Sequence, residues 1–198
     1  MQTDLLALAG FALAASITPG PNNLMLMASG ANHGIVRSLP LWCGIWSGFV
    51  LLIVVVGLGA GALILENPPV RAGFRVACAL VILWLGWKIA TARRAGTGPD
   101  APRPLGYVQA AAFQWINPKG WTMALAAISL YAPGTRLLDI LLVAGIFALV
   151  NIPSTAVWLV TGERVQRALR REVHFRLFNI AMAALLVGSV MPMLLGER

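Results

Sequence analysis

Charged side chains are scarce in this sequence, and acidic ones above all. Only 11% of the 198 residues are charged, with seven Asp and Glu against fifteen Lys and Arg. An ordinary soluble domain carries about 25% charged residues. With 59% hydrophobic residues and a mean hydropathy of +0.79, the chain has too few charged groups to cover a soluble globule. The composition therefore excludes a soluble domain and indicates an integral membrane protein.

Histidine and cysteine are equally rare, with two of each. Cys43 and Cys78 lie inside apolar runs without metal-ligand spacing, so we interpret them as reduced, buried small hydrophobes. His33 and His174 have no evident acidic or nucleophilic partner in the sequence, so no reactive pair of the kind an enzyme needs is visible. The sequence thus predicts no catalytic residues, no metal site and no cofactor, and a membrane-embedded enzyme is the least favoured alternative.

Long stretches without charge are what the sequence has instead. A spanning helix needs about 20 such residues, and the charge-free runs are 5–36, 38–65, 140–162 and 177–196. We predict one transmembrane domain over 1–198, with an uncleaved first helix and a polar linker at 92–104. The six predicted helices cover 4–32, 39–65, 71–91, 105–131, 137–161 and 174–195.

The basic residues lie between the apolar runs, which argues against a nucleic-acid partner despite the net charge of +8. Loops after the first, third and fifth predicted helices hold about ten basic residues, against four on the opposite side. The richer side is predicted to be cytoplasmic, so both termini are predicted to face outward. The ten are Arg37, Lys88, Arg93, Arg94, Arg103, Arg164, Arg167, Arg170, Arg171 and Arg176, and the four are Arg71, Arg75, Arg136 and Arg198.

Two proline-containing breaks interrupt the first and fourth predicted helices at matching places. A shift of 99 positions lays "ITPGPN" from Ile17 on "INPKGW" from Ile116, so that Pro19 meets Pro118. Three helices in each half make the halves, about 1–91 and 105–198, inverted repeats of one another. Inverted repeats with broken helices are typical of secondary transporters, whose binding sites lie at the breaks. The alternative is a pair of plain proline kinks that are eased by helix packing.

The residues at the breaks, with nearby amides, form the predicted substrate site. Freed carbonyls and half-helix N-termini become binding groups there, because proline removes a backbone donor and unpaired backbone groups are costly in lipid. Lys119 needs a partner, which the sequence leaves open as a carbonyl, a substrate carboxylate or another helix's carboxylate, unless it is solvated near a surface. Asp139 is the candidate for proton coupling. The predicted site residues are Thr18, Pro19, Gly20, Pro21, Asn22, Asn23, Gln114, Asn117, Pro118, Lys119 and Asn151.

Two segments resemble the lysine exporter (LysE/RhtB) family. "TPGPNNLMLMASGANHGIVRSLPLWCGIWSG" resembles its first-helix motif, and "FQWINPKGW" resembles its second motif, an Asn-Pro-Lys in the fourth helix. "WKIAT" at 87–91 and "FNIAMAALLV" at 178–187 resemble the cysteine/O-acetylserine exporter branch most. That branch can lack the Pro-Lys after the Asn, whereas this chain keeps both. The motif residues that carry the resemblance are Pro19, Gly20, Pro21, Asn22, Asn117, Pro118 and Lys119.

The resemblance implies a multi-pass protein of the bacterial inner membrane that exports amino acids or their derivatives, driven by the proton gradient. The substrate's carboxylate is expected at the half-helix that starts after Pro21 or at Lys119, and its ammonium near Thr18 or Asn117. Its partners would be the small-molecule substrate and membrane lipid, and a homo-oligomer is left open. A passive channel or a structural membrane subunit is the alternative function.

Overall fold

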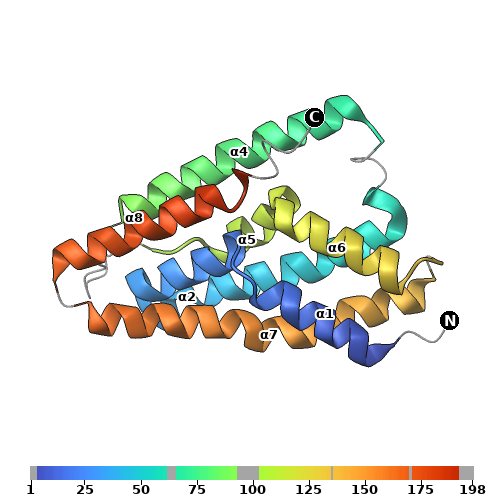
Figure 1. The fold of residues 1–198 in the computed structure, drawn as a ribbon, viewed down its shortest axis with the longest axis horizontal. Coiled ribbons are helices and arrows are strands. Elements are labelled where there is room, and N and C mark those ends of the chain that lie inside the picture. The colour runs from blue at the N-terminus through green and yellow to red at the C-terminus, as the bar shows by residue number, and fades with distance from the viewer. Residues whose placement is uncertain (1–3, 62–65, 93–102, 135, 170, 192–198) are drawn as a thin grey trace.

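The chain folds into a bundle of helices that run back and forth along one long axis (Figure 1). The structure is a computed structural model and describes residues 4–61, 66–92, 103–134, 136–169 and 171–191. All regular structure in these residues is helical, which confirms the predicted class. The elements are α1 (Leu5–Ile17), α2 (Pro21–Val55), η1 (Val56–Ala60), α4 (Pro68–Ala90), α5 (Tyr107–Phe113), η2 (Gln114–Ile116), α6 (Pro118–Tyr131), α7 (Leu137–Ala168) and α8 (Glu172–Gly188).

Three stretches are long and apolar enough to cross a membrane, namely Pro21–Ala60, Pro68–Ala90 and Leu137–Ala168. Proline begins two of them, where its missing N–H is no loss and its fixed φ favours a first helical turn. Asn67 caps α4 by accepting a hydrogen bond from the Val70 amide at 3.3 Å. The three long apolar stretches agree with the membrane protein that the composition predicts.

The first two predicted helices meet at a turn on Gly34, and α2 includes both limbs. Gly34 has φ 77°, a left-handed conformation that favours glycine. Across the turn the hydroxyls of Ser29 and Ser38 are 2.7 Å apart, whereas nine residues of straight helix would span about 13.5 Å. The chain therefore folds back on itself here, and the gap predicted between Asn32 and Leu39 shrinks to one glycine.

The two limbs of α2 pack on successive stretches of α7. Before the turn, Gly30 packs directly on the backbone of Leu159 and Glu163 in α7. After the turn, Trp42 donates from its indole to the Thr155 hydroxyl at 2.7 Å, and Trp46 donates to the Ala148 carbonyl at 2.8 Å. The second limb thus returns toward the N-terminus of α7, which makes α7 the axis of the bundle.

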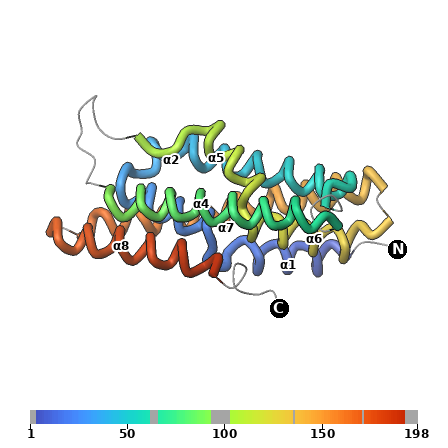
Figure 2. The backbone as a smooth tube through the Cα atoms, turned by 90° about the horizontal axis from the view of Figure 1, so that it is seen from above, coloured from blue at the N-terminus to red at the C-terminus, as the bar shows by residue number. Residues whose placement is uncertain are grey.

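Helices α4 and α8 pair along one side of the bundle (Figures 1 and 2). Gly86 permits the approach, since a Cβ there would lie 3.1 Å from a methyl group of Val187. The outward faces of this pair carry exposed apolar side chains such as Leu80, Trp87 and Leu177. In a membrane protein such faces meet lipid or another helix rather than water.

Several predicted boundaries differ from the observed ones. The fourth predicted helix begins at Tyr107 rather than residue 105, and the fifth continues to Ala168 rather than 161. The additional turns of the fifth helix carry an ion pair between Glu163 and Arg167, 3.1 Å apart. Opposite charges four residues apart stabilise a helix. Residues 93–102 of the predicted linker and 192–195 of the last predicted helix lie outside the described residues. The six-segment inverted repeat stays a prediction.

Candidate functional site

The first break is a three-residue gap between α1, which ends at Ile17, and α2, which begins at Pro21. The gap frees the last carbonyls of α1, and side chains from elsewhere satisfy them. Asn23 donates from its amide to the carbonyls of Ser16 and Thr18, both at 2.8 Å. Trp158 of α7 donates to the Ile17 carbonyl at 3.1 Å. The freed carbonyls of the break thus have side-chain donors, as backbone groups within a membrane need.

The second break separates η2 from α6 at Asn117, whose φ −82° and ψ 107° are extended, and Pro118 begins α6. Trp121 donates from its indole to the Trp115 carbonyl at 2.9 Å. The thiol of Cys78 on α4 donates to the Ile116 carbonyl. Pro21 and Pro118 therefore each begin a new helix at the breaks that the sequence predicts.

A cluster of three amides joins the two breaks. Asn22 and Gln114 exchange two hydrogen bonds, of 2.8 and 3.0 Å. Asn117 donates to Asn22 Oδ1 at 3.1 Å and to Gln114 Oε1 at 3.3 Å. Residues 92 and 95 positions apart in the chain are thereby held side by side, so the predicted neighbourhood of the two motifs is present.

Lys119 crosses from the second break to the first. Its Nζ donates to the Thr18 carbonyl at 2.6 Å and to the Pro19 carbonyl at 3.3 Å. The partner that the sequence leaves open is therefore a pair of backbone carbonyls at the negative end of α1. Gly20 makes room for this side chain, because a Cβ at Gly20 would lie 2.5 Å from Lys119 Cδ. The φ of Gly20 is −178°, which any residue adopts, so space is the reason for glycine here.

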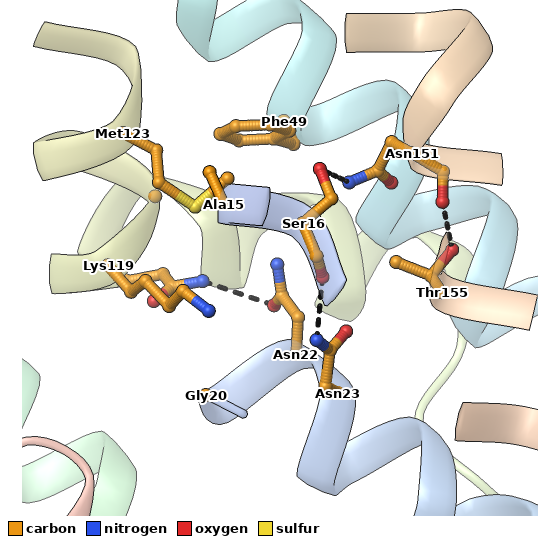
Figure 3. Close-up of a pocket in the computed structure, with 12 residues that line it drawn as sticks. Ala15, Ser16, Gly20, Asn22, Asn23, Phe49, Lys119, Met123, Asn151 and Thr155 are labelled. Atoms are coloured by element: carbon orange, nitrogen blue, oxygen red, sulfur yellow. Dashed lines mark hydrogen bonds between the residues drawn. The ribbon is translucent and has the colours of Figure 1, made fainter. Parts of the chain in front are cut away.

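A small cavity of about 20 Å³ lies where the breaks and α7 meet, which is room for about one water molecule. Figure 3 shows Lys119 and Met123 on one side of it, Asn151 and Thr155 on the other, and Ser16, Asn22 and Asn23 between. Asn151 reaches the cavity from α7 and donates to the Ser16 hydroxyl at 3.3 Å. The remaining lining residues are Ala15, Gly20, Phe49, Asn117 and Gly120.

Two hydrogen-bond acceptors at this cavity have no donor. Oδ1 of Asn117 and Oδ1 of Asn151 are buried without a partner, and the two residues are 1% and 5% exposed. A buried acceptor without a donor costs about 1–3 kcal/mol, so such groups are rare. The cavity therefore offers two unused acceptors, and among its described lining residues Lys119 is the sole one with a titratable side chain.

Two helix N-termini also point into this region. α2 begins after Gly20 and α6 begins after Asn117, and the first-turn amides of each lack intrahelical acceptors. Each N-terminus carries about half a positive charge. Together with Lys119 they make this part of the site positive, and among the described lining residues none is acidic.

The structure brings most of the predicted site residues together. Gly20, Asn22, Asn23, Asn117, Lys119 and Asn151 line the cavity. Thr18 and Pro19 supply carbonyls to Lys119, Gln114 belongs to the amide cluster, and Pro21 and Pro118 start the half-helices. Asp139 is not among the lining residues, since it lies 12 residues before Asn151 on α7, or about 18 Å along the helix.

Sequence reasoning did not identify several lining residues. Ser16 precedes the first break by two residues, and Thr155 lies one turn after Asn151, so both had a local signal in the pattern of polar residues. Phe49, Met123 and Ala15 lie in uniformly apolar runs, where nothing local distinguishes a cavity wall from a lipid face.

Comparisons with known proteins show the family of the chain. A family model described as LysE type translocator matches residues 13–194. The chain is 30% identical over 179 residues to a cysteine/O-acetylserine efflux protein of Salmonella choleraesuis, covering 89% of this chain and 90% of that protein. It is 29% identical, with the same coverage, to a cysteine/O-acetylserine efflux protein of Escherichia coli K12. No solved structure matches the chain.

Proposed function

Because the chain belongs to the LysE type translocator family, we propose that it is a secondary active exporter of amino acids or amino-acid derivatives, driven by the proton gradient. The observation that carries this proposal is the pair of donorless oxygens, on Asn117 and Asn151, in a cavity that two helix N-termini also face. An α-amino acid carries an ammonium and a carboxylate one carbon apart, and the cavity offers both a set of acceptors and a set of donors.

The ammonium of the substrate fits the acceptor side. An ammonium has three N–H donors and no acceptor. The unpaired oxygens of Asn117 and Asn151 and the carbonyl of Thr18 are acceptors of the kind it needs. A bound ammonium would relieve both unpaired oxygens, so part of the substrate's binding free energy would come from groups that are unsatisfied in its absence.

The carboxylate fits the donor side. The N-termini of α2 and α6 present backbone amides without intrahelical acceptors, and a helix N-terminus is a ready site for an anion. Proline at the first position of each helix removes one amide, so the donors are those of Asn22, Asn23, Lys119 and Gly120. A zwitterion would thus lie between the two breaks.

The walls favour a small side chain. Ala15, Phe49 and Met123 supply the apolar part of the lining. The similar proteins are named for cysteine and O-acetylserine, and we propose substrates of this size for this chain. The cavity of about 20 Å³ is far below the roughly 300–1,000 Å³ of ordinary ligand pockets, so a state with a wider cavity must exist in the cycle. We attribute that opening to rocking of the two predicted repeats, about 1–91 and 105–198.

We place the protein in the bacterial inner membrane, with the arginine-rich loops in the cytoplasm and both termini outside. Arg164, Arg167 and Arg171 follow the charge-free part of α7 and supply much of this asymmetry. A homo-oligomer is compatible with the exposed apolar faces of α4 and α8.

Transport into inside-out vesicles tests the function. With an imposed proton gradient, vesicles that contain the wild type should accumulate one class of a labelled panel of cysteine, O-acetylserine, threonine, homoserine and lysine. Asn151→Leu removes one unpaired acceptor and should lower uptake at subsaturating substrate about tenfold, for a loss of about 1.4 kcal/mol. Ile152→Leu, one residue along the same helix and exposed, is the control and should transport as the wild type does.

Two results would overturn the proposal. If vesicles with the wild-type protein accumulate no member of the panel beyond the level in vesicles without the protein, the export function is wrong. Uptake that runs downhill only, without counterflow of labelled against unlabelled substrate, would identify a passive channel instead.

Gly20→Ala tests whether transport depends on the position of Lys119 without disturbing folding. The three atoms nearest to a methyl group at Gly20 all belong to the flexible end of the Lys119 side chain, so the chain should fold normally while the lysine is pushed off the Thr18 carbonyl. We expect transport to fall about tenfold and the unfolding temperature to change little, within about 0.5 kcal/mol of stability. Gly106→Ala is the matched control, because Gly106 also precedes a helix in extended conformation but a Cβ there would meet no atom within 4 Å. Equal transport by both variants would contradict the role assigned to the Lys119 position.

A further inference from the structure

An ammonium already occupies one of the proposed acceptors, the Thr18 carbonyl beside the cavity, and it belongs to the protein. Lys119 Nζ lies 2.6 Å from the Thr18 carbonyl oxygen. That same oxygen also accepts the Asn23 amide at 2.8 Å. A carbonyl oxygen has two lone pairs, so the Thr18 carbonyl is fully used while Lys119 is in place. A substrate ammonium can bind this oxygen only when Lys119 leaves it.

The charge of Lys119 depends on these carbonyls. Lys119 is the second residue of α6, at the positive end of that helix, where a cation is unfavourable. The N-terminus of α2 lies beside it as well, since Gly20 is in contact with its side chain. The negative end of α1, with the Thr18 and Pro19 carbonyls, is what offsets these two positive ends. Without these carbonyls, a half-buried ammonium would stand against two positive helix ends.

We propose that Lys119 is the proton carrier of the exporter, and that its ammonium and that of the substrate occupy the Thr18 and Pro19 carbonyls in turn. This inference rests on the proposed export function. When a zwitterionic substrate enters from the cytoplasm, its ammonium takes the carbonyls, and Lys119 releases one proton to the cytoplasm and becomes a neutral amine. The loaded carrier then opens outward, the substrate leaves, and Lys119 takes one proton from outside. Each cycle exports one zwitterion and imports one proton.

Other titratable groups do not compete for this role in the described residues. α1, α2 and α7 present Ser16, Asn22, Asn23, Asn151 and Thr155 to the cavity, none of which titrates. From α4 the neighbouring titratable group is Cys78, whose thiol is engaged by the Ile116 carbonyl. Along their helices, Asp4 and Asp139 lie at least 11 residues, or about 16 Å, from the nearest lining residue. Glu163 lies eight residues, or about 12 Å, beyond Thr155 on α7 and pairs with Arg167 at 3.1 Å. Asp139, the group predicted from the sequence, is therefore replaced by Lys119 in this proposal.

Binding measurements on the purified protein distinguish proton exchange from a merely structural lysine. In weakly buffered detergent solution between pH 5.5 and 7, saturating O-acetylserine should release about one proton per wild-type molecule, reported by a pH indicator. Its affinity should rise about tenfold for each unit of pH, because binding and deprotonation are linked. Lys119→Gln should release no proton and bind with an affinity independent of pH. Because the competing ammonium is gone, this variant should bind about tenfold or more tightly than the wild type at pH 5.5.

A second variant and a control distinguish proton release by Lys119 from a structural role of its charge. Lys119→Arg keeps a charge that is never released, so it should bind O-acetylserine poorly at every pH and support no gradient-driven accumulation in proteoliposomes. If Lys119 only held the two breaks together, Lys119→Arg would retain both binding and accumulation. Lys88→Gln removes the other lysine of the chain, which lies over the Trp84 ring at 5.3 Å, and should match the wild type.

The failures of the two proposals are distinguishable. If wild-type proteoliposomes show no counterflow of any amino acid, the export function itself fails. If counterflow is present, three results would overturn the assignment of Lys119. These are binding without proton release by the wild type, weaker binding by Lys119→Gln at pH 5.5, or accumulation by Lys119→Gln against a substrate gradient.

Discussion

Gly162→Ala should prevent α7 from packing on α2 and sharply reduce the amount of folded protein. A Cβ at Gly162 would overlap the Met27 carbonyl oxygen and lie 3.0 Å from the Ala31 amide nitrogen. These are backbone atoms, so no side-chain rotation relieves the contact and the helices must separate. Overpacking costs about 1–3 kcal/mol where side chains can adjust, and we expect about 3 kcal/mol or more here. Thermal unfolding in detergent, followed by size-exclusion chromatography, measures the effect.

Each of the two helices contributes a glycine to this contact. Gly30 of α2 packs on the Leu159 carbonyl of α7 as Gly162 of α7 packs on Met27 of α2. Small residues allow such close approach of helices in membranes, where packing replaces the hydrophobic effect as the driving force. Gly145→Ala is the matched control on α7, since its Cα faces open space. It should change stability by no more than about 0.5 kcal/mol. Equal stability of the two variants would show that the helices do not cross this closely.

Asn23→Leu should have the second largest effect on stability. Leucine has a similar size but donates nothing, so the carbonyl of Ser16 loses its donor and that of Thr18 keeps only Lys119. Asn23 is 3% exposed, and water cannot readily replace its amide. At about 1–3 kcal/mol for each lost partner, we expect about 2–4 kcal/mol in total.

Asn67→Leu is the comparison for that variant. Asn67 also bonds backbone, as the cap of α4, but it is exposed. Loss of an exposed cap costs about 1 kcal/mol. Urea or thermal unfolding of both variants in the same detergent should give the larger loss for Asn23→Leu. A smaller loss than that of Asn67→Leu would mean that the first break is hydrated rather than sealed by the amide.

The two helix breaks were predictable because proline acts locally. Pro21 and Pro118 each start a helix that the preceding extended residues could not continue, and the chemistry of one ring decides it. The turn on Gly34 was not predictable in the same way. The sequence around it, "NHGIVRSLP", has one glycine and a later proline, and Pro40 lies inside the second limb of α2 rather than at its start. The turn depends on how both limbs pack on α7.

The site was predictable to the same degree. Asn22 and Lys119 directly follow Pro21 and Pro118, and Asn117 directly precedes Pro118, so the two proline motifs identified these polar residues together. The choice among the partners of Lys119 was not predictable, because the Thr18 carbonyl is 101 residues away and every residue has a carbonyl. The apolar walls at Phe49 and Met123 had no local signal for the same reason. Local chemistry thus indicates where a break forms, while long-range packing decides what faces it.

Cys78 gives the molecule a natural reporter of the second break. Its thiol is buried and donates to the Ile116 carbonyl, immediately before Asn117. We expect a thiol reagent to be excluded while η2 and α4 are in contact, and a motion that separates Ile116 from α4 to expose the thiol. Cys43 is exposed, so the sequence-based prediction that it is buried is wrong, because its side of the apolar α2 helix is not covered by another helix in the described residues; we expect its reaction to set the baseline. The rate at which a maleimide modifies Cys78 therefore follows the opening of the transporter in the unaltered sequence, without an introduced label.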